Sequence, residues 1–331
     1  MDALFYFVVS NGNAGIILAF LFAQGVATLM LPIRLRRRMP VGWRWSADAG
    51  EWLDRKLNRD KREQKARFFR GLIATVVMVI AGFSVGHIFR AYNAILILAL
   101  LVVTMHATLP YVALAQSVRV LKRNDKNLMR VLLSIFGRAP AEFSDLHGLS
   151  RQAIELGAWL LNRLLVGPVF WFLLAGAEGL AIYVAIAALD QAIGIQDEQH
   201  KYFGWTAAKL DDALNFIPAR LTALLIVVAA VFVSKASPRA AFQVALDQAR
   251  QYPALNAGWP LAAMAGAVGV TLAGPLVGGD SGITPPRPWI GAKGSSAKVE
   301  ITDVVRAKWI AGISFLIMLA LVSLAFSLKN A

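Results

Sequence analysis

The sequence predicts an all-α fold: a polytopic helical integral membrane protein with about four to six transmembrane or re-entrant segments and cytoplasmic amphipathic helices. The 331-residue chain is 57% hydrophobic and 16% charged, whereas soluble domains have about 25% charged residues. Its mean hydropathy is +0.57. The basic residues, which give a formal net charge of +14, flank the apolar runs. We therefore expect the chain to contact a lipid bilayer and no nucleic acid.

Four apolar runs are each long enough to cross about 30 Å of hydrocarbon as a helix. They are Ala14 to Ile33, Gly71 to Phe89, Ala94 to Val118 and Ile310 to Leu328. The first run lacks the basic start and the cleavage site of a signal peptide, so we interpret it as a permanent span. The last run, within residues 309–328, is expected to be an anchor. No separate soluble domain is expected, so residues 1–331 form a single membrane domain.

The charge of the connecting segments predicts their sides of the membrane. Residues 34–70 carry thirteen Lys or Arg and five Asp or Glu, which places this basic loop in the cytoplasm and the N-terminus outside. Residues 119–163, with eight basic and four acidic residues, return to the cytoplasm. Apolar residues at mostly helical spacing predict an amphipathic helix there, at the membrane surface or against a partner helix. A solvated helix that packs on its own protein is the alternative.

The topology after residue 163 stays open. Leu164 to Leu189 is apolar except for Glu178, expected at mid-depth, and forms either one span or a re-entrant pair broken at residues 176–179. Asp190 to Arg220 carries three basic and five acidic residues, which mildly favours the outside. Leu221 to Ser234 is short for a span unless the preceding residues 214–219 join it.

The acidic stretch after this run predicts a site. In a helix, Asn215 follows Asp211 by four residues and Asp212 by three, so one face offers an amide beside a carboxylate. Oxygen ligands of this kind suit Mg²⁺, which makes Asp211 and Asp212 candidate metal ligands. The alternative is a charged helix turn paired with Lys209 and Arg220.

Several ordered motifs resemble the CobD/CbiB family of cobalamin biosynthesis. The family's FGW, LDD and PARLT occur at matching spacing in residues 203–223, FGWTAAKLDDALNFIPARLTA. Its LDSMxGYxNE resembles residues 189–198, LDQAIGIQDE. Four further motifs complete the match: GPVFW at 167–171, NAGWP at 256–260, AMAGA at 263–267 and PWIG at 288–291. The resemblance covers residues 165–291, and ordered motifs of this length are specific.

The resemblance implies a ligase of vitamin B12 synthesis in the bacterial inner (cell) membrane. Such enzymes join aminopropanol, or its phosphate, to adenosylcobyric acid with ATP and Mg²⁺, so a corrinoid and an aminopropanol-type amine are the implied substrates. The implied catalytic residues are Asp190, Glu198, Asp211 and Asp212, and the implied substrate-binding residues are Lys209, Asn215, Arg220, Asn256 and Trp259. Homo-oligomers and other membrane proteins stay open as further partners.

Departures from the family pattern define the alternative function. Of the family's ESxAENxxDG signature, this chain keeps the first residue, Glu155. At later acidic or amide positions of the signature it has Trp159, Leu160 and Arg163. Ala139 replaces the aspartate of its GRDT. Because carboxylates bind Mg²⁺ and steer amines, the alternative is a non-catalytic AmpE-like paralogue with a regulatory or scaffolding role in the inner membrane.

Other mechanisms fit the sequence less well. Its four histidines lack a zinc-binding spacing, and no GxxxxGK[ST] phosphate loop occurs. A transporter could use Glu178, but no internal repeat of spans is evident.

Overall fold

The computed structural model describes residues 12–30, 39–59, 63–92, 94–135, 145–194, 199–275 and 287–330, and these ranges are mostly helical. The α-helices are α2 (Gly12–Met30), α3 (Val41–Leu57), α4 (Gln64–Tyr92), α5 (Ala94–Thr104), α6 (Leu109–Lys122), α7 (Lys126–Ser134), α8 (Leu146–Leu160), α9 (Gly167–Ile193), α10 (Trp205–Val231), α11 (Pro238–Gln248), α12 (Gly258–Val268) and α13 (Ile301–Asn330). A π-helix, η2 (Leu161–Val166), and a 3-10 turn, η3 (Ala249–Gln251), complete the helical elements. Two short strands, β1 (Leu272–Ala273) and β2 (Trp289–Ile290), pair antiparallel. The predicted all-α class is confirmed.

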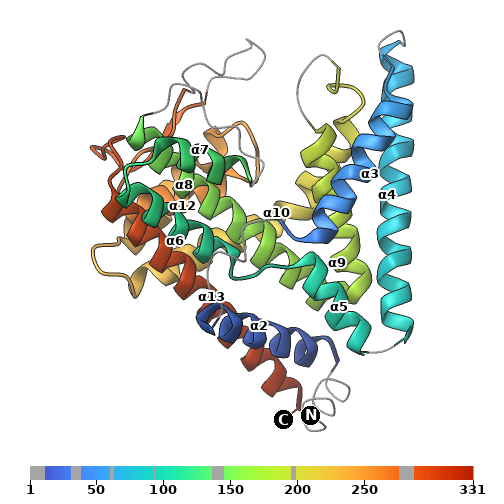
Figure 1. Cartoon of the computed structure of the whole chain (residues 1–331), viewed down its shortest axis with the longest axis horizontal. Helices are drawn as coiled ribbons and strands as arrows, with labels where there is room; N and C mark the ends of the chain where they lie inside the picture. Colours follow the sequence, from blue (N-terminus) through green and yellow to red (C-terminus); the bar gives the residue numbers. More distant parts are fainter. Residues whose placement is uncertain are drawn as a thin grey trace.

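Two groups of helices meet at α10. Figure 1 shows α3, α4 and α9 on one side and α6, α8, α12 and α13 on the other, with α2 along α13. α10 packs against both α9 and α12, and so joins the two groups.

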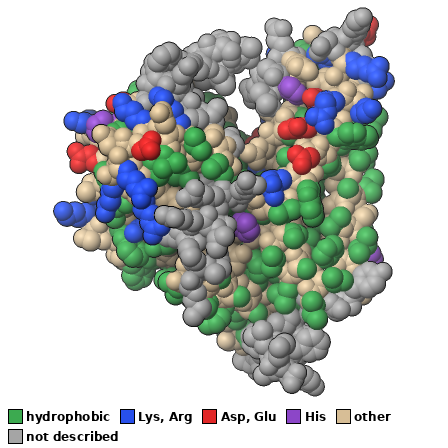
Figure 2. Space-filling view, in the orientation of Figure 1, with side chains coloured by type: hydrophobic (Ala, Val, Ile, Leu, Met, Phe, Trp, Pro, Cys, Tyr) green, Lys and Arg blue, Asp and Glu red, His purple; other side chains and the backbone are tan. Residues whose placement is uncertain are grey.

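Within the described ranges, five helical segments are long and apolar enough to cross a membrane, as expected of a multi-pass membrane protein. They are Gln64–Ala91, Ile95–Lys122, Leu146–Ile193, Trp205–Val231 and Ile301–Leu328. In Figure 2, hydrophobic side chains cover the outer flank of α4. On this helix Ile73, Ile80 and Phe83 are more than half exposed, as expected where lipid replaces water. The doubtful run at residues 221–234 is helical as far as Val231, and residues 214–219 do join it in the long helix α10.

Two predicted spans differ in detail. The first corresponds to α2, an apolar helix of 19 residues that is not among the five long segments, and residues 31–38 lie outside the described ranges. The third predicted span, Ala94 to Val118, is interrupted between α5 and α6, because residues 105–108 are not helical. The Trp43 indole donates to the Thr104 carbonyl at this break, which satisfies an acceptor that the helix end leaves free.

The expectation of an amphipathic surface segment at residues 119–163 is wrong for residues 146–163, and residues 136–144 lie outside the described ranges. α7 is amphipathic, with Met129, Leu132 and Leu133 buried. α8 and η2, however, are almost wholly buried and continue into α9 as part of the segment Leu146–Ile193. Apolar spacing alone does not distinguish a membrane surface from the interior of the protein. Ala139 lies outside the described ranges.

The run at residues 164–189 is one helical element with a kink, intermediate between the two expected forms. The kink lies at Ala175 and Gly176, and Gly176 has φ 64° and ψ −152°, a conformation open essentially only to glycine. Glu178 follows it and pairs with Arg90 (3.2 Å) and His87 (3.4 Å) near the C-terminal end of α4. The expectation that Glu178 lies at mid-depth is therefore wrong, because it lies level with Arg90, near the C-terminal end of α4.

The other end of α9 lies beside the basic segment. Asn58 donates to the Gln199 carbonyl (3.1 Å), and His200 lies 3.4 Å from Asp54. A Cβ on Gly71 would meet the Phe203 carbonyl oxygen at 1.8 Å, so this turn rests directly on the start of α4. The mild charge preference that placed the start of residues 190–220 opposite the basic loop is wrong.

This arrangement predicts the sidedness of single cysteines in a chain that has none of its own. Arg55→Cys and Lys201→Cys should react with an impermeant maleimide from the same side of oriented vesicles, and Ala91→Cys from the other side. All three positions are exposed. Labelling of the first two from opposite sides would contradict the packing of the 199–204 turn against α4.

Candidate functional site

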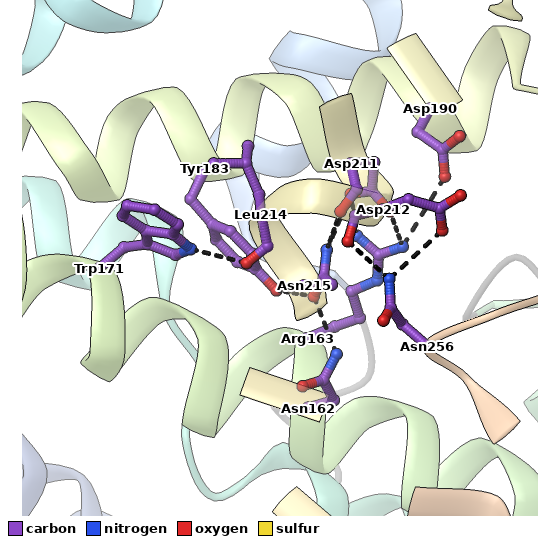
Figure 3. A network of polar contacts seen from close by, with 10 residues as sticks. All are labelled: Asn162, Arg163, Trp171, Tyr183, Asp190, Asp211, Asp212, Leu214, Asn215 and Asn256. Carbon is purple, nitrogen blue, oxygen red and sulfur yellow. Dashed lines mark hydrogen bonds and ion pairs between the residues drawn. The ribbon is translucent and has the colours of Figure 1, made fainter. Parts of the chain in front are cut away.

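Polar side chains from η2, α9 and α10 converge where α9 ends and α10 begins (Figure 3). Arg163 comes from η2, Asp190 from the last turn of α9, and Asp211 and Asp212 from α10. Asn256 lies in the turn before α12. π-helical turns are frequent at functional sites, and here η2 places two consecutive polar residues, 162 and 163, against α10.

A bidentate ion pair forms the centre of this cluster. Arg163 Nη1 and Nη2 donate to Asp211 Oδ1 and Oδ2 at 2.5 and 2.7 Å. The side chains of Arg163 and Asp211 are only 12% and 5% exposed. Arg163 Nη2 also lies 3.7 Å from Asp190 Oδ2. Planar two-point pairing of this kind is the strongest geometry available to a guanidinium and a carboxylate.

A chain of buried amides and hydroxyls completes the inner side. Asn215 Nδ2 donates to Asp211 Oδ1 at 3.0 Å, and its Oδ1 accepts from Asn162 (2.9 Å) and Tyr183 (3.1 Å). Thr222 Oγ1 in turn donates to Asn162 Oδ1 at 3.1 Å. These bonds satisfy the groups that burial removes from water. The prediction that Asn215 lies beside a carboxylate is confirmed for Asp211.

Two carboxylates form the outer side of the cluster. The Asp190 and Asp212 side chains are 23% and 34% exposed. Asn256 Nδ2 donates to the backbone carbonyl (2.7 Å) and to the Oδ1 atom (3.3 Å) of Asp212. Lys209 Nζ lies 4.0 Å from Asp212 Oδ2. Three carboxylates thus face one guanidinium and one largely exposed ammonium, which leaves a negative charge at the outer side.

A cationic edge lies next to this carboxylate pair. The Arg220 guanidinium stacks over the Phe216 ring at 3.5 Å and faces the Trp259 ring at 4.7 Å. Arg220 Nη1 lies 3.5 Å from Asn256 Oδ1, so Asn256 contacts both Asp212 and Arg220. Trp259 Nε1 is buried without a hydrogen-bond partner in the described part of the chain. Such donors fit a phosphate or carboxylate group.

The geometry therefore brings eight of the nine predicted site residues together. Glu198 lies outside the described ranges. The residues that sequence reasoning missed are Arg163, Asn162 and Tyr183. Arg163 was noted only as a lost family acid, although an arginine between buried leucines already indicates a buried partner.

Cofactor binding can be tested against this geometry. Both Asp211 oxygens accept hydrogen bonds from Arg163, and Oδ1 also accepts one from Asn215. The Asn215 amide oxygen points to Asn162 and Tyr183. No group of three or more His, Cys, Asp or Glu residues that could hold a metal ion occurs in the described ranges. The residues present do not fit a Mg²⁺ ion bound through Asp211.

Glu155, the surviving glutamate, has a different partner. Its carboxylate accepts from the Ala273 amide (2.9 Å) and from Arg287 (2.5 Å), and so holds β1 to the residues before β2. Burial lowers the pKa of the Arg287 guanidinium, but the charge of Glu155 and other interactions outweigh burial and raise it overall. Gly274, next to Ala273, has φ +77°, and a Cβ at this position would collide with the Trp289 ring. The PWIG motif at 288–291 thus pairs with β1 in the small sheet.

Comparison with known proteins adds an independent line of evidence. The family model described as CobD/Cbib protein matches residues 26–311. The Cobalamin biosynthesis protein CobD of Brucella anthropi is 45% identical over 147 residues, 44% of this chain and 45% of the relative. That of Rhodobacter capsulatus is 42% identical over 156 residues, 47% of each chain. The protein of that name from Rhizobium meliloti is 34% identical over 262 residues, 74% of this chain and 80% of the relative.

The first two alignments therefore span less than half the length of each relative, 45% and 47%. No solved structure matches the chain.

The different burial of the two neighbouring aspartates predicts different costs of substitution. Asp211→Asn leaves the buried Arg163 charge without its bidentate partner, with only Asp190 at 3.7 Å as counter-ion, and should lower the free energy of unfolding by about 3–5 kcal/mol. Asp212→Asn, at a carboxylate whose side chain is 34% exposed, should cost less than about 1 kcal/mol. Unfolding of the detergent-solubilised protein by dodecyl sulfate measures both.

Arg163→Met/Asp211→Leu is the matched control, since removing both charges together should restore most of the stability that Asp211→Asn loses. Equal losses for the two Asn variants would show that the ion pair is not a buried one.

Proposed function

The chain belongs to the CobD/CbiB family of cobalamin biosynthesis, and we propose that it forms the amide bond between aminopropanol, or its phosphate, and adenosylcobyric acid. The product is adenosylcobinamide or its phosphate. A role in cobalamin biosynthesis follows from the family, and the particular reaction is our proposal.

The observation that carries the proposal is the pair of opposite charges on either side of Asn256. The carboxylates Asp190 and Asp212 leave negative charge that suits an ammonium group. Arg220, held between aromatic rings, offers a preorganised guanidinium for a phosphate. Aminopropanol phosphate carries both groups a few bonds apart. One such molecule can therefore bridge Asp212 and Arg220, which a single asparagine already connects.

This placement assigns roles to the residues in amide formation. The amine nitrogen attacks the activated propionate carbon, a C–N bond forms, and the bond to the phosphate leaving group breaks. Asp190 or Asp212 accepts the proton that the ammonium loses, as a general base within reach of the amine. Arg220 and the Trp259 indole stabilise phosphate oxygens. Lys209 and Asn256 steer the approach.

ATP remains in the proposal as the source of the activating phosphoryl group. Family membership supports its use, and no residue is assigned to it. The side of the membrane agrees with ATP use, because the acidic cluster lies near the end of α9 that contacts the basic segment, which positive-inside reasoning puts in the cytoplasm. We propose the bacterial inner membrane as the location.

The regulatory or scaffolding alternative is not favoured by the comparisons, which return CobD proteins. It predicts that the outer carboxylates can be replaced without loss of cobalamin synthesis. One experiment therefore separates the two functions.

The test is complementation of a strain that lacks its adenosylcobinamide-phosphate synthase and must make cobalamin from adenosylcobyric acid. The wild-type chain should restore growth, and Asp190→Asn, Asp212→Asn and Arg220→Ala should each reduce it strongly. Asp48→Asn, at an exposed position of α3, is the matched control and should grow like wild type. Failure of a well-expressed, membrane-inserted wild-type chain would favour the regulatory alternative.

A further inference from the structure

The position that a divalent cation would need in the acidic cluster is filled by a side chain. The Arg163 guanidinium lies against both oxygens of Asp211 and 3.7 Å from Asp190 (Figure 3). It reaches this position from η2, and its side chain is 12% exposed. Arg163 therefore bridges an inner and an outer carboxylate, as a bound cation would.

A metal ion cannot bind next to this guanidinium without displacing it. Mg²⁺ approaches its oxygen ligands to about 2.0–2.1 Å, and each Asp211 oxygen already accepts from Arg163 at 2.5 or 2.7 Å. Displacement would leave the guanidinium buried and unpaired, at a cost of several kcal/mol. A dication that remained beside it would be repelled by its charge.

The outer carboxylates do not replace the lost ligands. Asp212 is held by Asn256 and lies near Lys209, and Asp190 is already shared with Arg163. The amide oxygens of Asn162 and Asn215 both face inward, where each accepts from neighbouring donors. Asp190 and Asp212 keep oxygens that face outward, but the positive charges of Arg163 and Lys209 beside them oppose the binding of a divalent cation.

We propose that Arg163 is a permanent replacement for a divalent cation, so that the cluster of Asp190, Asp211 and Asp212 binds no metal ion in this protein. The guanidinium supplies the positive charge that holds Asp211 and Asp190 together. Exchange of Arg163 for an acidic residue converts the cluster into a metal site. The inference concerns the ion alone and holds whether or not the proposed amide synthesis is correct.

The test is a titration of the full-length, detergent-solubilised protein with Mn²⁺, in which free Mn²⁺ is counted by electron paramagnetic resonance. The wild-type chain should show only weak surface binding that Asp211→Asn does not change. Arg163→Asp should gain about one site per chain, bound at least about tenfold more tightly than any wild-type site. Its thermal midpoint should rise with Mn²⁺, because an ion that binds only the folded state stabilises it.

Two matched variants control for charge and for location. Arg119→Asp makes the same charge reversal at an exposed position of α6 and should gain no site. Arg163→Asp/Asp211→Asn should lose the gained site, which places the ion at the cluster. Where Arg163→Asp does not yield folded protein, Arg163→Ser opens the same position without adding a charge and should bind Mn²⁺ in an Asp211-dependent way.

The inference is overturned by wild-type Mn²⁺ binding that Asp211→Asn abolishes, because the ion would then coexist with Arg163. It is also overturned by folded Arg163→Asp and Arg163→Ser proteins that bind no more Mn²⁺ than wild type. None of these readings depends on amide synthesis, so loss of the proposed function leaves them unchanged.

Discussion

The ion pair between Arg163 and Asp211 is the interaction on which the site depends. It joins η2 to α10, and η2 connects α8 to α9 without a break, so one contact fixes the ends of two long segments relative to each other. Because an unpaired charge at this depth costs several kcal/mol, neither α9 nor α10 can rotate far about its axis. Asp190 and Asp212 keep their positions as a result.

Neighbouring residues of α10 have opposite tasks. Asp211 faces the protein interior and is satisfied by Arg163 and Asn215, while Asp212 faces outward beside Asn256. Successive residues of an α-helix point about 100° apart, so one acidic pair can serve both packing and ligand binding. The rigid inner network supports the outer carboxylates, and preorganisation of this kind is what binding and catalysis require.

The sequence predicted the long helices, the amide beside Asp211 and the residues that gather at the site, because helical periodicity and family motifs are local signals. It did not predict the partner of Asp211, since Arg163 lies 48 positions away and an arginine at the end of an apolar run resembles an interfacial anchor. The depth of Glu178 was misjudged because depth was counted along residues 164–189 alone, whereas the helical segment begins at Leu146. The side of the 199–204 turn was misjudged because a small charge bias weighs less than contacts with residues 54–71.

Family motifs and the charge of the site reside on different elements. FGW, LDD and PARLT lie at or on α10 and NAGWP leads into α12, whereas the residue that sets the charge at the centre lies on η2. The resemblance implies an acid at position 163, and arginine there differs from it in formal charge by two, which is the charge of one divalent cation. Three carboxylates with an internal guanidinium thus have the same net charge as four carboxylates with one bound divalent ion. On the proposed role of Arg163, this exchange lets the chain keep the motifs of its family without the acidic signature that the resemblance implies.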